Sequence, residues 1–326
     1  MAAYIIRRLL FSIPILIGVN LLVFMLFFLV NTPDDMARQA LGDKASQPEQ
    51  LKRWKIAHGY QYPKFWNRNA SGTKKVSQTI FYQKSLRMFW GDFGRTDMTM
   101  EPISRDICSR IGPSLFLTIP IFLVSLLLNV FFSLFLAARR GTVIDFMGQF
   151  YCVILMSIST LIYIIAGQFC FAKLLHLVPV SGFATGFSMV KFLILPIFIG
   201  ILSNLGSGIR FYRTLFLEEI NKDYVRTAKA KGLSTKYILW THVLKNAMIP
   251  ILTNLPLQIL WLIMGNLLLE NFFGIPGLGS YTINAIASQD FAIVRAMVFL
   301  GSVLYIFGIL LADISYSFVD PRIRLE

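Results

Sequence analysis

The sequence predicts an all-α membrane protein with about six transmembrane helices and a long loop after the first of them. Of its 326 residues, 56% are hydrophobic and only 15% are charged, and the mean hydropathy is +0.63. An average soluble domain carries clearly more charge than this. Several apolar runs also reach the roughly 20 residues that a helix needs to cross the hydrocarbon core of a bilayer.

Six apolar runs of sufficient length define the predicted spans. They lie at residues 9–30, 114–138, 150–175, 192–212, 249–269 and 296–318. The first is longer than the apolar core of a signal peptide, and no small-residue cleavage site follows it, so we expect it to be retained. Prolines in or near four runs predict kinks, which helix bundles tolerate.

Basic residues give these spans an orientation. The formal net charge is 31 − 17 = +14, and most of the basic residues outside residues 31–113 flank spans on a shared side. They are Arg7, Arg8, Arg139, Arg140, Arg322, Arg324 and eight residues between positions 210 and 245. The positive-inside rule places these segments and both termini in the cytoplasm.

The loop after the first span carries fourteen Lys and Arg against eight Asp and Glu. Loops beyond about 60 residues escape the charge rule, so this one can lie outside. Trp54, Trp66 and Trp90 either pack a small core in it or lie at the membrane interface. The chain therefore divides into the first span (1–30), an extracytoplasmic loop region (31–113) and a five-span core (114–326).

A polar cytoplasmic segment, residues 214–248, separates the fourth and fifth spans. We expect a helix over residues 218–231 that stops at Gly232, since glycine readily adopts the left-handed conformation. Ser234 or Thr235 then caps a second helix. Pro250 marks the start of the fifth span, where its missing N–H is least costly.

The surface of this segment leaves two interpretations open. Ala228 and Gly232 lie one turn apart, and small residues let another chain approach closely, which favours a docking surface for a cytosolic protein. Arg226, Lys229 and Lys231 surround them, and basic residues over anionic headgroups equally describe a helix at the membrane surface.

The same residues carry a family resemblance. Residues 224–232 (Tyr-Val-Arg-Thr-Ala-Lys-Ala-Lys-Gly) and 245–250 (Lys-Asn-Ala-Met-Ile-Pro) resemble the signature loop of ABC transporter permeases of the dipeptide, oligopeptide and nickel class. The general importer pattern is Glu-Ala-Ala, three residues, Gly. Aligned on Gly232, only Ala228 and the glycine remain, a departure typical of the peptide class that leaves no role for the general family's glutamate.

Four further stretches resemble the first permease subunit of such a pair. They are residues 4–10 (Tyr-Ile-Ile-Arg-Arg-Leu-Leu), 91–95 (Gly-Asp-Phe-Gly-Arg), 273–279 (Phe-Gly-Ile-Pro-Gly-Leu-Gly) and 320–322 (Asp-Pro-Arg). The glycine-rich stretch lacks nucleotide-binding spacing, and no Gly-x-x-x-x-Gly-Lys-Ser/Thr occurs in the chain. We therefore interpret residues 273–279 as a turn.

The resemblance implies a multi-pass importer subunit of the bacterial cytoplasmic (inner) membrane, not an enzyme, that forms half of an alternating-access pathway for peptides or similar small solutes. Its implied partners are a homologous second permease subunit, an extracytoplasmic solute-binding protein, membrane lipid and two cytosolic ATP-binding subunits, which carry ATP and Mg. Cofactors bound by the chain itself and nucleic acid are not expected. The implied ATPase-docking residues are Arg226, Thr227, Ala228, Lys229, Ala230, Lys231 and Gly232.

Polar residues within or at the ends of spans are candidates for the pathway or its gate. They are Asn129, Gln168, Glu270, Asn271 and Asp313. Each has a plainer explanation: hydrogen bonds between helices for Asn129 and Gln168, a solvated helix end for Glu270 and Asn271, and the cytoplasmic interface for Asp313.

Three alternatives to a peptide importer subunit remain. A secondary transporter driven by an ion gradient needs carboxylates inside its spans, and Asp313 is the one candidate. A membrane scaffold would use the basic loop to recruit a cytosolic protein. An ABC permease for nickel or another solute shares the family motifs. Metal ligation by this chain itself is not expected, because its cysteines and histidines lack ligand spacing.

Overall fold

The computed structural model describes residues 2–30, 32–42, 47–68 and 70–319. Within these ranges every named element is a helix, and the one β-type contact is an isolated bridge between Arg95 and Pro102. The predicted all-α class is therefore confirmed. The motif at residues 320–322 lies outside the described residues.

Five helices of the described chain are long and apolar enough to cross a membrane. They include Leu10–Phe28, Ile103–Ala138, Gly186–Ile220, Leu255–Phe273 and Phe291–Ile314. A bent pair, Val143–Ser157 with Thr160–Leu174, raises the number to six if it counts as one span. The prediction of about six spans agrees with this result.

The third predicted span, residues 150–175, is not one straight helix. Helix α7 (Val143–Ser157) and helix α8 (Thr160–Gly167) meet at an angle of 87°. Ser157 turns its hydroxyl back to the Val153 carbonyl, and Ser159 caps α8 by accepting a hydrogen bond from the Leu161 amide. Serine hydroxyls that bond to nearby backbone groups compete with a continuous helix, which accounts for the break.

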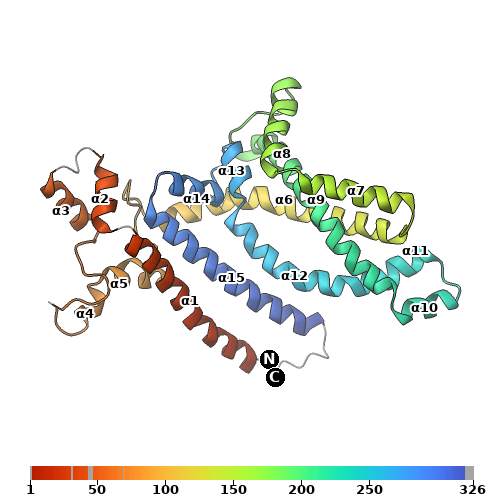
Figure 1. The fold of residues 1–326 in the computed structure, drawn as a ribbon, viewed down its shortest axis with the longest axis horizontal. Helices are drawn as coiled ribbons and strands as arrows, with labels where there is room; N and C mark the ends of the chain where they lie inside the picture. The colour runs from red at the N-terminus through yellow and green to blue at the C-terminus, as the bar shows by residue number, and fades with distance from the viewer. Residues whose placement is uncertain (1, 31, 43–46, 69, 320–326) are drawn as a thin grey trace. The chain divides into compact units, whose positions relative to one another are not determined.

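The chain forms two compact units, which are described separately. The first comprises Met1–Arg110 with Tyr281–Ile306, and the second comprises Ile111–Ser280 with Phe307–Glu326. Figure 1 gives the order of the helices along the chain.

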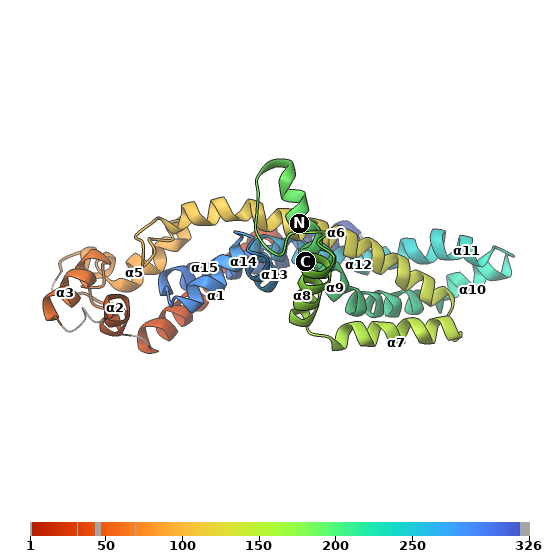
Figure 2. The same cartoon turned by 90° about the horizontal axis from the view of Figure 1, so that it is seen from above.

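In the first unit, the long loop is folded. Helices α2 (Pro33–Leu41), α3 (Pro48–Ala57), α4 (Lys74–Ser77) and α5 (Ile80–Lys84) follow α1 (Ala2–Val30), and Figure 2 shows α2 and α3 lying together. Phe24 and Phe28 of α1 pack with Tyr60 and the partly buried Trp54 in an aromatic cluster. Trp54 therefore belongs to a core, whereas Trp66 and Trp90 are exposed.

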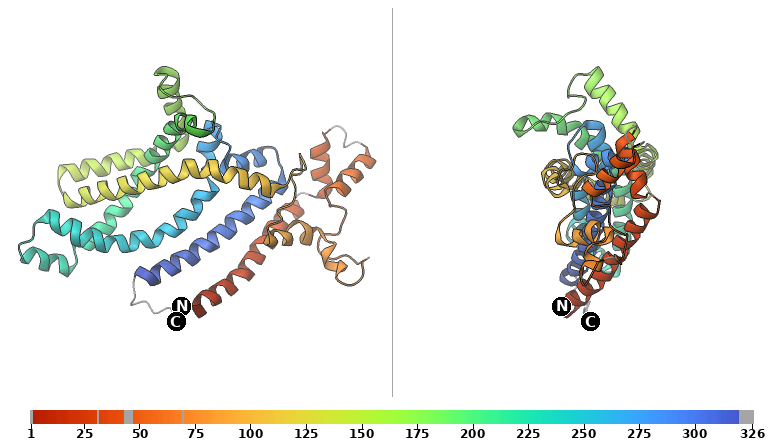
Figure 3. Two further views of the ribbon diagram at one scale, coloured as in Figure 1. Left: turned by 180° about the vertical axis from the view of Figure 1, so that it is seen from behind. Right: turned by 90° about the vertical axis from the view of Figure 1, so that its left-hand side faces the viewer.

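The second unit contains most of the spans. Their helices are α6 (Ile103–Ala138), α7, α8, α9 (Met189–Ile220), α12 (Leu244–Met264) and α13 (Leu267–Phe273). Helices α14 (Leu278–Ala287) and α15 (Phe291–Val319) each have residues in both units. Two apolar clusters hold the unit together, one around α8 and α13 and one near α10 (Asp223–Ala230). Helices α7 and α9 pack side by side, as Figure 2 shows, and Figure 3 gives two further views of the same helices.

The fifth span does not begin at Pro250. A π-helical segment, Ile238–Val243, leads into α12, which contains both Pro250 and Pro256. Asn246 donates a hydrogen bond to the His242 carbonyl and Thr253 donates one to the Pro250 carbonyl. Both bonds run back to carbonyls of the same helical stretch, and α12 continues through its two prolines, which transmembrane helices packed in bundles tolerate.

Candidate functional site

The polar segment between α9 and α12 folds as a short helix, a glycine elbow and a second helix start. Gly232 has φ +78°, the left-handed conformation predicted for it, and Ser234 caps the next turn by accepting a hydrogen bond from the Tyr237 amide. The first helix differs from the prediction over residues 218–231. Helix α9 continues to Ile220 and α10 begins at Asp223. The two residues between them, Asn221 and Lys222, are not helical.

Helix α10 has one buried face and one exposed face. Val225 is 1% exposed and Ala228 is 6% exposed, and both pack in a cluster with Phe216 of α9 and Ala247 of α12. This cluster also includes residues of α6 and the π-helical segment. The other predicted docking residues are exposed, namely Arg226, Thr227, Lys229, Ala230, Lys231 and Gly232.

Ala228 thus faces the interior of the chain rather than a partner. Its small side chain lets α10 pack closely against the other helices of the cluster. The basic side chains lie on the opposite, exposed face of α10. Because α10 shares one core with α6, α9 and α12, a force applied to its exposed face acts on all three helices.

A carboxylate anchors the break between α9 and α10. Glu219 is 8% exposed, accepts a 2.7 Å hydrogen bond from the Tyr224 hydroxyl and forms an ion pair with Lys222. Burial and the bond to Glu219 raise the pKa of Tyr224 to about 12. The phenol therefore stays protonated and remains a hydrogen-bond donor at physiological pH.

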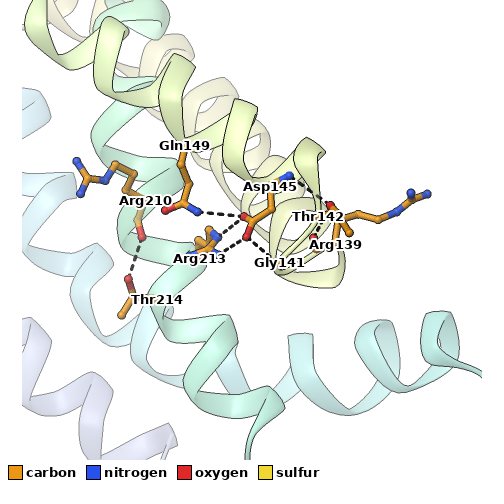
Figure 4. Close-up of polar contacts among 8 residues, drawn as sticks. All are labelled: Arg139, Gly141, Thr142, Asp145, Gln149, Arg210, Arg213 and Thr214. Atoms are coloured by element: carbon orange, nitrogen blue, oxygen red, sulfur yellow. Dashed lines mark hydrogen bonds and ion pairs between the residues drawn. The ribbon is translucent and has the colours of Figure 1, made fainter.

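An ion pair joins α7 to α9 (Figure 4). Arg213 donates to both carboxylate oxygens of Asp145, over 2.8 and 2.7 Å. The Gly141 amide and the Gln149 side chain also donate to this carboxylate, and the two charged side chains are only 14% and 6% exposed. Sequence analysis used Arg213 for orientation alone. The sequence offers one local indication for Asp145. It lies three residues after Thr142, the N-cap of α7, and therefore in the first turn of that helix.

A cavity of about 520 Å³ lies among α6, α9 and α12. Asn129, a predicted pathway candidate, is one of its lining residues. The lining combines apolar and polar side chains and includes no Asp, Glu, Lys, Arg or His; its polar members are Thr118, Ser125, Asn129, Asn204, Ser207, Tyr212, Gln258 and Asn266. The cavity among α6, α9 and α12 therefore has side chains that can form hydrogen bonds.

Glu270 is not at a solvated helix end. It has no exposed surface and accepts hydrogen bonds from the Ser114 hydroxyl at 2.8 Å, the Ser280 amide at 3.0 Å and the Asn266 amide at 3.1 Å. A Cβ at Gly265 or Gly277 would overlap its carboxylate. The glycines of the 273–279 stretch therefore leave room for a buried hydrogen-bonding centre, and Gly274, with φ +66°, ends α13 in a turn as predicted.

The remaining pathway candidates lie apart from the cavity. Gln168 donates to the Val180 and Phe272 carbonyls, Asn271 is exposed on α13, and Asp313 is half-buried in α15. The structure therefore places one of the five, Asn129, in the cavity lining.

The first unit holds a buried charged cluster that sequence analysis missed. Arg295 is 2% exposed, and its guanidinium lies over the Phe28 ring and donates to the Tyr60 hydroxyl. Tyr60 in turn donates to Asp97. Burial, and then the positive charge of Arg295, lower the pKa of nearby Lys84 to about 8. These residues lie far apart in sequence, so no local pattern connects them.

Membrane-length helices, a polar cavity among three of them and an exposed basic helix packed on the same three define an integral membrane transport component. Residues 103–325 match the family described as binding-protein-dependent transport system inner membrane component. The match covers more than half of the chain, and the chain belongs to this family. It is thus a permease subunit of an ABC importer, as the signature segment indicated.

Full-length relatives agree with this assignment. The chain is 31% identical over 332 residues to the oligopeptide transport system permease protein AppB of Bacillus subtilis (strain 168), covering 99% of this chain and 100% of that protein. It is 28% identical over 349 residues to the dipeptide transport system permease protein DppB of Alkalihalophilus pseudofirmus, with 99% and 100% covered. It is 29% identical over 332 residues to the glutathione transport system permease protein GsiC of Salmonella paratyphi A, with both chains fully covered.

Proposed function

We propose that this chain forms half of a translocation pathway for peptides, together with a homologous second permease subunit. Two cytosolic ATP-binding subunits drive the pathway between its outward-open and inward-open states, and an extracytoplasmic solute-binding protein delivers the substrate. The relatives AppB, DppB and GsiC are named for oligopeptide, dipeptide and glutathione transport. All three substrates are peptides, which supports the substrate class.

One observation carries the coupling part of this proposal: α10 has an exposed basic face and a buried face that shares a core with the spans. Its docking residues are Arg226, Thr227, Lys229, Ala230, Lys231 and Gly232, with Ala228 as the inner support. When the ATP-binding subunits approach each other, they displace α10, and the shared core transmits that displacement to α6, α9 and α12.

The docking surface is tested with a charge reversal. Lys229→Glu with Lys231→Glu changes two exposed side chains, so we expect an unchanged melting temperature. Recovery of the ATP-binding subunits with the purified permease falls on the order of tenfold, because charges at the contact now repel. Lys52→Glu with Lys74→Glu makes the same charge change in the first unit and serves as the control. Equal recovery from both double variants would refute docking at α10.

We further propose that both termini and residues 214–248 are cytoplasmic and that residues 31–113 face the opposite side, in line with the charge rule for short loops. Single cysteines replace Glu49 or Lys229, both exposed, after Cys108, Cys152 and Cys170 have been removed. In spheroplasts, a membrane-impermeant maleimide should label the first cysteine and leave the second unmodified. The reverse pattern would invert the topology.

A further inference from the structure

The folded loop of the first unit holds a histidine between two hydrogen-bond acceptors. His58 follows the last turn of α3. Its Nδ1 lies 2.8 Å from the Trp54 carbonyl oxygen, and its Nε2 lies 3.1 Å from the Asp97 carbonyl oxygen. A carbonyl oxygen accepts hydrogen bonds and cannot donate one, so each ring nitrogen must supply the proton. Both contacts are hydrogen bonds only when His58 is the positively charged imidazolium, which carries a proton on each nitrogen.

The packing of the ring favours the same charge state. The imidazole of His58 stacks on the indole of Trp54, with ring centroids 4.0 Å apart and an angle of 21° between the planes. A cation over the face of an indole is attracted by its π-electrons, and a neutral ring lacks this attraction. His58 is only half-buried, so solvent can deliver or remove its proton.

The charged side chains around His58 are balanced in sign. On α3 itself, Lys55 pairs with Asp34 of α2. The other charged groups come from the neighbouring elements and meet at Tyr60 or at the Asp97 amide; they are Asp97 and Asp290, which are negative, and Lys84 and Arg295, which are positive. Because these charges offset one another, the two carbonyls and the indole that touch the ring decide its charge state.

His58 connects α3 to a segment that is fixed on the last span. The Asp97 amide donates to the Asp290 carboxylate over 3.1 Å, and this carboxylate also accepts from the Ile293 amide in the first turn of α15. The charged ring of His58 bonds to α3 on one side and to the Asp97 segment on the other. A neutral ring donates to only one carbonyl and presents a lone pair to the other, so it holds one side only.

We propose that His58 is a pH-dependent clasp, in which the doubly protonated ring holds α3 to the Asp97 segment and loss of one proton opens the connection. The folded chain then binds more protons at this site than the unfolded chain, so stability from the clasp is present at acidic pH. It is lost as pH rises through the range in which histidine titrates. The clasp lies in the loop proposed to face the outside, and only the compartment whose pH it senses rests on that proposal.

The first test observes the two ring protons directly. The chain has three histidines, and the other two, His176 and His242, lie outside the first unit. Replacing both by glutamine leaves His58 as the one histidine that ¹⁵N labelling can report by NMR in lipid bilayers. A chain that keeps only the exposed His176 is the matched reference.

At pH 7.5, the ratio of doubly protonated to neutral ring should be on the order of tenfold higher for His58 than for His176, the effect of one hydrogen bond from a charged donor. Equal ratios at the two positions would overturn the clasp. Both sides of the bilayer have the same pH in this measurement, so an inverted topology would leave its result unchanged.

The second test compares melting temperatures in detergent at pH 6 and pH 8. The advantage of the unmodified permease over His58→Gln should be larger at pH 6 and should shrink by about 2–4 °C at pH 8, because glutamine does not titrate. His176→Gln makes the same chemical change at an exposed position of the second unit, and its difference from the unmodified protein should not follow this pattern. A difference for His58→Gln that is constant with pH would show that the ring holds the loop without a proton switch.

Discussion

Glu270 connects three segments through its two carboxylate oxygens. Oε1 accepts from Ser114 on α6 and from the Asn266 amide before α13, and Oε2 accepts from the Ser280 amide on α14. Because the carboxylate has no exposed surface, water cannot replace a bond that is lost. This residue therefore stabilises the turn between α13 and α14 and its contact with α6.

Glu270→Gln should destabilise the protein, although it preserves the shape of the side chain. The new NH₂ group must face at least one of the present donors, which leaves a buried donor unsatisfied at a cost of about 2–3 kcal/mol. We expect a lower melting temperature in detergent. Asn271→Ala changes the neighbouring, exposed residue and should leave melting almost unchanged. Equal melting temperatures for both variants would show that Glu270 does not hold the turn.

Lys84 predicts a pH dependence in the first unit. Burial and the charge of Arg295 lower its pKa in the folded chain from 10.5 to about 8, so between pH 8 and 10.5 the unfolded chain binds more protons than the folded one. Stability from this group must therefore rise with pH across that window, by an amount on the order of 1–3 kcal/mol.

The comparison with Lys84→Met isolates this effect. From pH 8 to pH 10, the melting temperature of the unmodified protein should rise relative to that of the variant, in which no group titrates at this position. A difference between the two proteins that is constant with pH would show that Lys84 titrates normally.

At the scale of elements, the Asp145–Arg213 pair fixes α7 to α9, the helix that leads into α10. Removing one partner leaves a nearly buried charge alone, which costs about 3–5 kcal/mol. Asp145→Asn and Arg213→Gln should each destabilise the protein, and the double variant should lose clearly less than the sum of the two. Thermal unfolding of the four proteins measures this coupling. Additive losses would mean that the two side chains do not stabilise each other.

Local signals predicted the elements well. Apolar runs located the spans, Gly232 marked the end of α10, and Ser234 marked the next cap, because each depends on a few neighbouring residues. The two errors in the predicted spans, at the third and the fifth, each arise at a few residues. The hydroxyls of Ser157 and Ser159 interrupt an apolar run that hydropathy alone predicts as one helix. Helix α12 continues through Pro250, because helices packed in a bundle tolerate proline.

The site was only partly predictable. The sequence was enough to propose the basic segment and Asn129 as candidates, but the inward orientation of Ala228 depends on packing against Phe216 and Ala247. The partners Asp145 and Arg213 are 68 residues apart, and Ser114 and Glu270 are 156 apart. Pairs at such distances leave no local pattern in the sequence.

At the scale of the whole molecule, the chain belongs to a family of inner membrane components, and the basic helix α10 and the cavity involve the same three spans. The central proposal is that ATP hydrolysis in partner subunits, rather than an ion gradient, drives peptide across this pathway. The alternative of a secondary transporter predicts uptake by the permease with a gradient alone.

Uptake of trialanine into proteoliposomes that contain the complete transporter tests this proposal most directly. The energy source is varied while the peptide is held constant. We expect uptake that requires ATP, persists when an ionophore collapses the proton gradient, and is lost in the Lys229→Glu, Lys231→Glu variant. Uptake that follows an imposed proton gradient without ATP would contradict the account.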